Sequence, residues 1–248
     1  MSQKSGFTVN HAPDRATLER QSALAIADSL RSLLARQQTV RAVFAAAASQ
    51  LGTLALLRQQ DGIDWHRVEA FHMDEYVGLP IEHPARFGNW LKRNVFDHLP
   101  LGAVHLIEPG ADAQAAAQNY AAQLAAAPID LVCLGIGVNG HIAFNDPPVA
   151  DFNDPLTVKV VELDLVCRQQ QVDDGEFATT ADVPRHAITL TIPQLMAGKR
   201  LICIVPGASK AAAVRGTIHG PIDTACPASI LRRHDDCTLY VDQESYPQ

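Results

Sequence analysis

The sequence contains few of the features that hold small or secreted proteins together. Only five of its 248 residues are cysteines, and they show neither the close pairing of a zinc site nor the even count of a disulfide framework. Cys133 and Cys203 lie inside apolar runs, as small buried side chains do. We therefore expect no metal and no disulfide, and we expect the protein to work in the reducing cytoplasm.

Long apolar runs and positive charge are also scarce. No stretch approaches the roughly eighteen apolar residues of a membrane-spanning helix. The first residues do not combine a basic start with an apolar core, as a secretory leader would. The formal net charge of -7 leaves no basic stripe for a polyanion. We therefore expect neither a membrane nor a nucleic-acid partner, and a small anionic ligand would need a local positive pocket.

What the chain does contain is apolar residues in a regular alternation. Hydrophobic residues make up 47% and charged residues 19%, a balance that excludes disorder. Apolar runs of strand length alternate with segments of helical spacing, without a repeat or a linker. This pattern predicts a single three-layer α/β domain over residues 1–248, with a modified Rossmann-like, mostly parallel sheet and helices on both faces. The expected strands are 40–47, 67–73, 104–107, 129–134, 157–163, 201–205 and 238–241, and the expected helices are 18–34, 85–96, 111–127, 209–217 and 227–234.

Two adjacent carboxylates, Asp74 and Glu75, follow the expected strand 67–73. In open parallel sheets the ligand lies beyond the carboxyl ends of the strands, so this is a position where chemistry is expected. Neighbouring side chains of an extended chain point to opposite sides, so at most one of the two faces a pocket squarely. Taken alone, the segment is more typical of a solvated acidic turn.

A glycine-rich loop follows a second buried strand. Gly135, Gly137 and Gly140 match the dinucleotide-binding fingerprint by letter, but that motif requires a long helix that begins at the third glycine. Pro147 and Pro148 end any helix there after about one turn, which argues against a nicotinamide cofactor. The glycines are better explained by a tight turn and a close approach of the backbone to a ligand.

One histidine stands directly after this turn. His141 is suited to a general base, although a lone histidine is as often structural. Asp146 lies five residues later and could accept a hydrogen bond from one ring nitrogen, which would leave the other free to exchange a proton.

The third segment follows the expected strand 201–205. Gly207 and Ser209 precede Lys210 at the start of an expected helix, with Ser209 in the capping region. Backbone amides, the helix dipole and one cation would converge there, as in an anion site.

These segments together resemble the glucosamine-6-phosphate deaminase/isomerase family, whose superfamily also contains 6-phosphogluconolactonase. The resemblance covers residues 40–242 in collinear order. It is carried by the motifs Met-Asp-Glu-Tyr-Val-Gly-Leu-Pro at 73–80, Gly-His-Ile-Ala-Phe-Asn at 140–145 and Pro-Ala-Ser-Ile-Leu at 227–231. The wording of the first motif favours the isomerase branch over the lactonase branch.

The resemblance implies an enzyme that opens the ring of a hexosamine 6-phosphate, isomerises the aldose to a ketose and releases ammonia, without a metal or an organic cofactor. It assigns ring opening to His141 and proton transfer between C2 and C1 to Asp74. It also implies that Lys210 binds the phosphate and allows a homo-oligomer. The other residues expected to contact the substrate are Ser49, Gln50, Glu75, Gly137, Gly140 and Arg168.

The sequence departs from the family pattern around the histidine and the phosphate. Asn139 stands where an aspartate is usual, and Asp146 where a glutamate is usual; both are assigned to the catalytic group, and the asparagine resembles some galactosamine-6-phosphate deaminases. The usual glycine-rich phosphate turn is replaced by Ala-Ala-Ser-Gln at 47–50, where Ser49 and Gln50 can still donate hydrogen bonds. Arg168 is the nearest candidate for the clamp arginine.

Several alternatives remain open from the sequence. The substrate could be galactosamine 6-phosphate or another sugar phosphate such as 6-phosphogluconolactone, and the chain could be a sugar-phosphate-binding module that has lost turnover. Trp65 and Trp90 are expected to pack in the core, with an aromatic wall for the sugar as the alternative. The glutamine run 169–171 is expected on a solvated face.

Overall fold

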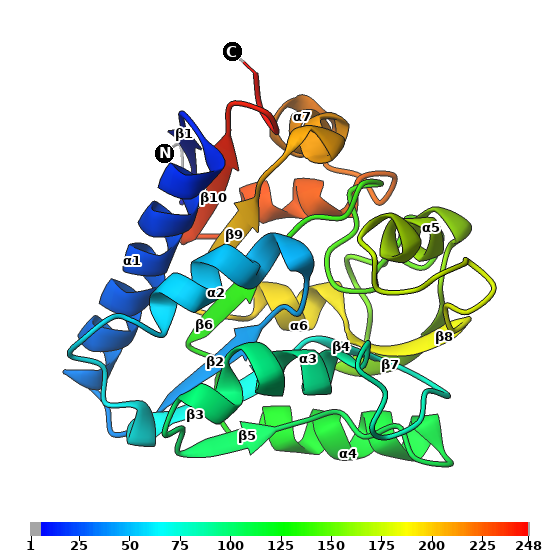
Figure 1. Ribbon diagram of the computed structural model, residues 1–248, viewed down its shortest axis with the longest axis horizontal. Helices are drawn as coiled ribbons and strands as arrows, with labels where there is room; N and C mark the ends of the chain where they lie inside the picture. The colour runs from blue at the N-terminus through cyan, green and yellow to red at the C-terminus, as the bar shows by residue number, and fades with distance from the viewer. Residues whose placement is uncertain (1–5, 248) are drawn as a thin grey trace.

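The computed structural model describes residues 6–247, and its centre is a seven-stranded parallel sheet (Figure 1). The strand order is β1–β10–β9–β6–β2–β3–β5, and every neighbouring pair is parallel. The expected Rossmann-like α/β sheet is confirmed. The single domain predicted over residues 1–248 remains a prediction, and residues 1–5 and 248 lie outside the described residues. The strands are β1 (Phe7–Ala12), β2 (Val40–Phe44), β3 (Val68–His72), β5 (Ala103–His105), β6 (Leu131–Leu134), β9 (Arg200–Val205) and β10 (Cys237–Asp242).

Helices cover both faces of the sheet, and its central strands are therefore buried on both sides. Along β6, Leu131 and Cys133 join one apolar cluster, whereas Val132 and Leu134 join the other. This alternation follows from the two-residue period of an extended chain. The first cluster includes α1 (Arg15–Leu34), α2 (Leu51–Leu57) and α3 (Phe87–Asn94); the second includes α4 (Ala113–Ala125), α6 (Ile192–Met196), α7 (Ala211–His219) and the 3₁₀ segment η5 (Pro227–Arg233).

Side chains that cap the first turn fix where two of the long helices begin. Asp14 accepts a hydrogen bond from the Thr17 amide at 2.7 Å, and Asp112 accepts from the amides of Gln114 and Ala115 at 3.0 Å each. Ser49, which follows the apolar run 40–47, does not cap a helix. Ser49 lies inside the 3₁₀ turn η1 (Ala48–Gln50), which has no side-chain cap and runs into α2.

A second, smaller sheet stands beside the first. It contains β4 (Asp74–Tyr76), β8 (His186–Leu190) and β7 (Val158–Glu162), all antiparallel. The strand predicted at 157–163 therefore exists, but its expected place in the parallel sheet is wrong. An apolar run shows that a strand is buried, but not which neighbour it pairs with.

The direction of the connections changes between two central strands. From β2 the chain continues to β3 and β5 on one side, whereas from β6 it continues to β9 on the other. The loops after β2 and β6 therefore separate and leave a crevice at the carboxyl ends of these strands.

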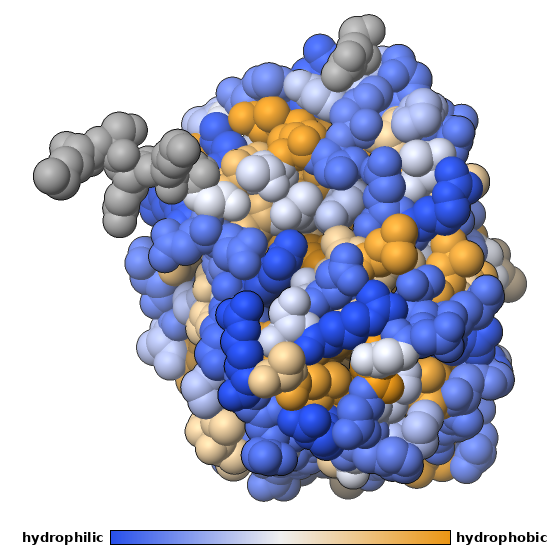
Figure 2. All heavy atoms as spheres, turned by 90° about the vertical axis from the view of Figure 1, so that its left-hand side faces the viewer, coloured by the Kyte–Doolittle hydropathy of each residue, from blue (hydrophilic) through white to orange (hydrophobic). Residues whose placement is uncertain are grey.

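The outer surface beside α1 is mostly hydrophilic. In Figure 2, apolar patches on this face are small and separated by polar side chains. Among residues 6–247, no helix combines the length and the apolar character needed to cross a membrane.

Candidate active site

A cavity opens at the carboxyl ends of the central strands, where the change of direction predicts one. Counting the open solvent at its mouth, it encloses about 670 Å³ that protein atoms do not fill. Polar side chains reach it from the turns after β2, β6 and β9, from the start of β4, and from α5 (Leu165–Asp173) with its following loop. They are Ser49, Asp74, His141, Gln170, Gln171, Asp174, Glu176 and Lys210.

Asp74 enters the cavity from the first position of β4. One residue, Met73, separates β3 from β4, so the carboxylate lies where the chain passes from the large sheet to the small one. Its side chain is buried, and the residue is only 7% exposed. Burial and the neighbouring charge of Glu75 raise the pKa of Asp74 well above its usual value. A carboxylate with a raised pKa is a stronger base than an ordinary aspartate.

Glu75 does not reach the cavity, and its predicted contact with the substrate is wrong. Its side chain points to the other side of β4, is fully buried, and accepts hydrogen bonds from the amides of Tyr76, Phe87 and Gly88 at 2.9 to 3.0 Å. Arg86 lies 3.6 Å from it. The expectation of a solvated acidic turn is also wrong. Glu75 holds the start of α3 against the small sheet.

Glu75→Ala is expected to destabilise the fold by about 3–5 kcal/mol, since three buried amides and Arg86 lose their acceptor. For a chain of this size that corresponds to a decrease of roughly 6–20 °C in Tm. Calorimetry on the variant and on Glu82→Ala, a matched change at an exposed neighbour, measures the effect. Equal Tm values for the two variants would contradict the role of Glu75.

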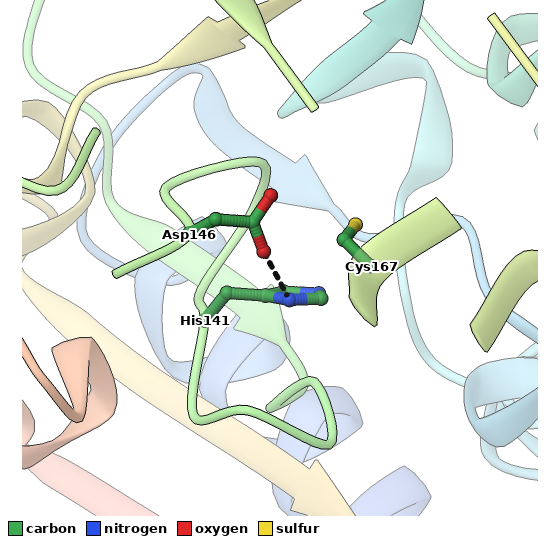
Figure 3. A group of neighbouring side chains, drawn as sticks. All are labelled: His141, Asp146 and Cys167. Atoms are coloured by element: carbon green, nitrogen blue, oxygen red, sulfur yellow. Dashed lines mark ion pairs between the residues drawn. The ribbon is translucent and has the colours of Figure 1, made fainter. Parts of the chain in front are cut away.

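Two acceptors orient the ring of His141. Its Nδ1 lies 2.8 Å from Oδ1 of Asn139. It also lies 2.9 Å from Oδ1 of Asp146 (Figure 3). Asn139 Nδ2 donates to the same Asp146 oxygen at 2.9 Å, which fixes the orientation of the amide. Two acceptors around Nδ1 favour the tautomer that carries its proton there, so Nε2 is left as the proton acceptor. The predicted contact between Asp146 and one ring nitrogen is present.

Two glycines of this loop have different roles: Gly137 leaves room for the ring of His141, and Gly140 makes the turn. A side chain at Gly137 would come within 2.1–2.3 Å of three ring atoms of His141, so only glycine leaves room for the imidazole. Gly140 does not line the cavity; its φ of +85° makes the turn, and a Cβ there would meet Cys226 at 2.8 Å. The predicted substrate contact of Gly140 is wrong. As expected, no helix follows the loop before β7 among the described residues.

Asp146, His141 and Cys167 form a buried group whose ligand atoms lie within 4.8 Å of one another (Figure 3). These residue types can hold a transition metal. Burial raises the pKa of the Cys167 thiol well above its usual value, and the charges of Asp146 and Asp74 raise it further. Burial also raises the pKa of Asp146, but the hydrogen bond and charge of His141 outweigh this and lower it overall. The ionised Asp146 carboxylate therefore pairs with the His141 imidazole. The Cys167 thiol stays protonated, and a metal would have to displace that proton.

Lys210 brings a cation into the cavity from the turn after β9. The residue is 7% exposed, and its ammonium forms no ion pair or hydrogen bond with any other described residue. Burial lowers its pKa, and Asp174 partly offsets this. A buried charge without a partner is costly, so this lysine is placed for an anionic ligand.

Other parts of the predicted anion site are wrong. Gln50 is buried and spends its amide on the Ile204 carbonyl at 3.0 Å, so it does not line the cavity. Arg168 donates to the carbonyls of Thr180 and Val183 and is also outside the lining. Near Lys210, the Gly207 amide donates to the carboxylate of Asp242 at 3.1 Å rather than facing a ligand. Ser49 and the alanines at 45–48 do line the cavity.

The sequence motifs did not indicate the part of the cavity that α5 forms. Gln170 and Gln171 line the cavity, so the expectation of a solvated face holds only for the exposed Gln169. Asp174 and Glu176 follow from the next loop. One signal was available: Gln171 lies four residues after Cys167, the spacing of one helix face. Trp65 and Trp90 lie in the apolar cluster as expected, and Trp90 also forms part of the cavity wall.

Fold and cavity define the class of the protein. It is an α/β protein with a cavity at the switch point of a parallel sheet, lined by a carboxylate, an imidazole and an ammonium that has no ion-pair partner among residues 6–247.

Comparison with known proteins narrows this class. The family model described as glucosamine-6-phosphate isomerases/6-phosphogluconolactonase matches residues 13–240. Glucosamine-6-phosphate deaminases of Bacillus thuringiensis (strain Al Hakam) and Bacillus anthracis (strain A0248) are each 38% identical over 202 residues, 81% of this chain and 75% of theirs. The chain therefore belongs to the glucosamine-6-phosphate isomerase/6-phosphogluconolactonase family.

Solved structures agree with this assignment. A monomeric glucosamine-6-phosphate deaminase is 27% identical and superposes with a TM-score of 0.88, over 96% of this chain and 98% of that one. The 6-phosphogluconolactonase of Thermotoga maritima, 18% identical, shares the fold with a TM-score of 0.77 over 95% of this chain and 99% of its own.

Proposed function

We propose that this chain converts glucosamine 6-phosphate and water to a ketose 6-phosphate and ammonia. The single observation that carries the proposal is that Asp74, His141 and Lys210 line the same cavity. The relatives named glucosamine-6-phosphate deaminase support it.

The chemistry divides between the two sides of the cavity. Nε2 of His141 takes and returns the proton that moves between the ring oxygen and the C1 hydroxyl during ring opening. Asp146 and Asn139 hold the ring, and the ionised Asp146 stabilises the imidazolium that forms. Asp74 then removes the C2 proton and returns it to C1. This leaves a C2 iminium, to which water adds before ammonia departs.

The phosphate is proposed to lie against Lys210, with Ser49 and the backbone of the alanine turn on its other side. The Lys210 ammonium has no ion-pair or hydrogen-bond partner among the described residues, and Ser49 offers a hydroxyl in place of the usual glycine-rich turn. Arg168 and Gln50, which are bonded elsewhere, take no part.

The test is a substrate panel. Ammonia release is measured with glucosamine 6-phosphate and with galactosamine 6-phosphate. Hydrolysis is measured separately with 6-phosphogluconolactone. Ammonia from the glucosamine epimer at millimolar concentration is the expected result. Ammonia from neither epimer would sink the proposal, and calorimetric binding of the sugar phosphate without turnover would identify a binding module.

Lys210→Met is expected to raise KM for the sugar phosphate by roughly 10- to 100-fold, since it removes a charge-assisted contact. It should also raise Tm in phosphate-free buffer: the folded state lowers the pKa of Lys210, so the ionised group costs stability at neutral pH. Inorganic phosphate should raise Tm in the wild type but not in the variant.

Lys199→Met is the matched control for this prediction. Lys199 pairs with Asp130, which precedes β6, and lies outside the cavity. The same phosphate response in wild type and Lys210→Met would show that the anion binds elsewhere.

The assembly and the compartment are part of the proposal only in outline. A homo-oligomer remains a prediction, since the monomeric state belongs to a relative. The cytoplasm remains the expected compartment, and the five cysteines are free.

A further inference from the structure

Three consecutive glutamines on α5 have three different environments. Gln169 is exposed and bonds Asp173 and Thr180 on the surface. Gln170 uses both ends of its amide: Oε1 accepts from the Val138 amide at 2.9 Å, and Nε2 donates to Asp174 at 3.3 Å. Gln171 is 7% exposed and lines the cavity, but only one end of its amide has a partner.

That partner fixes the direction of the Gln171 side chain. The hydroxyl of Tyr76 donates to its Oε1 at 2.8 Å, and Tyr76 is buried among the aromatic rings of Phe87, Phe144 and Phe177. The Nε2 group of Gln171 has no hydrogen-bond partner among residues 6–247. A nearly buried amide held at one end and unpaired at the other leaves two N–H donors for a ligand.

The position of Tyr76 indicates which end of the ligand these donors meet. Tyr76 and Asp74 are two residues apart on β4, so their side chains lie on the same face of the strand, whereas Glu75 points away. Gln171 is therefore bonded to a side chain on the same face of β4 as the Asp74 carboxylate. Lys210 enters from a different element, after β9.

We infer that Gln171 is a substrate-binding residue whose Nε2 donates to a sugar oxygen at the end of the substrate where Asp74 acts. The ligand chemistry is an oxygen acceptor next to the reacting carbons, such as the C1 oxygen that gains negative charge when the C2 proton leaves. A preorganised donor at such an oxygen is worth most in the transition state. Tyr76 is then a positioning residue, which acts through Gln171.

The test uses Gln171→Glu, because the Tyr76 hydroxyl can still donate to a carboxylate while the cavity loses its N–H donors and faces an acceptor. We expect kcat/KM for glucosamine 6-phosphate to fall by roughly 10- to 100-fold. The Kd of inorganic phosphate, which probes the Lys210 end, should stay within about threefold of wild type. Tyr76→Phe, which frees the amide to rotate, should cause a smaller fall in kcat.

Gln169→Glu is the matched control, since it adds the same charge two residues away on the exposed face of α5. Gln171→Met, of similar shape, guards against a folding defect: it should keep the wild-type Tm within a few degrees and still lose activity. Wild-type kcat/KM in Gln171→Glu, or an equal loss in Gln169→Glu, would overturn the inference. A phosphate Kd that rises in parallel with KM would also overturn it, because the donor would then serve the phosphate.

This inference rests on the proposed function, but the two fail differently. If the wild type releases no ammonia from either epimer, the proposed function fails. Calorimetric titration with glucosamine 6-phosphate then tests Gln171 alone: binding that Gln171→Glu weakens and Gln169→Glu does not would support it, and any other pattern would contradict it.

Discussion

Asp74→Asn is expected to reduce ammonia release by roughly 10⁴-fold, because an amide cannot accept the C2 proton. The substitution keeps the shape of the side chain at a buried position, so the cavity should remain intact. In D₂O the wild type should incorporate deuterium at C1 of the product, and the variant should not. Turnover within tenfold of wild type would rule out Asp74 as the base.

The same variant should be more stable than the wild type at neutral pH. The folded state raises the pKa of Asp74, so folding favours its protonated form, and the ionised carboxylate lowers the free energy of unfolding. The stability difference should be largest above the raised pKa and vanish below the ordinary pKa of an aspartate. The base must be ionised to act. As the pH is lowered, wild-type kcat/KM should therefore start to fall at a higher pH than it would with an aspartate of ordinary pKa.

His141→Gln is expected to slow turnover by roughly 10²- to 10⁴-fold, the range for a positioned acid–base group. The loss should appear in kcat more than in KM, since the imidazole moves a proton and does not hold the phosphate. The Kd of inorganic phosphate should not change.

The control for this prediction is His66→Gln at an exposed histidine. If His141 were only structural, the glutamine variant would lose Tm and phosphate binding together, with little change in kcat per folded molecule. That result would move ring opening to another group.

The central strands could be predicted because strands buried on both faces have a recognisable apolar pattern in the sequence. β6 and β9 are buried on both faces, so they appear as continuous apolar runs bounded by loops. β1 was missed because it is an edge strand with a half-exposed, mixed sequence. β8 was missed as well; it lies in the small sheet, where it pairs with β4 more than a hundred residues away.

The candidate site divides in the same way. Motifs indicated Asp74, His141 and Lys210, and all three line the cavity. The errors at Glu75, Gln50 and Arg168 concern where a polar side chain finds its partner. Each is bonded to a backbone group that folding brings close, such as the Ile204 carbonyl beside Gln50. Sequence patterns record polarity but not these distant partners.

Only one residue joins β3 to β4, so the length of the chain is fixed at the point where it passes from the large sheet to the small one. Met73 is anchored there, since its carbonyl accepts from the Leu190 amide at 2.8 Å. The registers of β3 and β4 are both fixed by their neighbouring strands. Inserting or deleting one residue between them would turn Asp74 toward α3 and Glu75 toward the cavity. Insertions and deletions in related chains should therefore avoid this junction and gather in outlying loops.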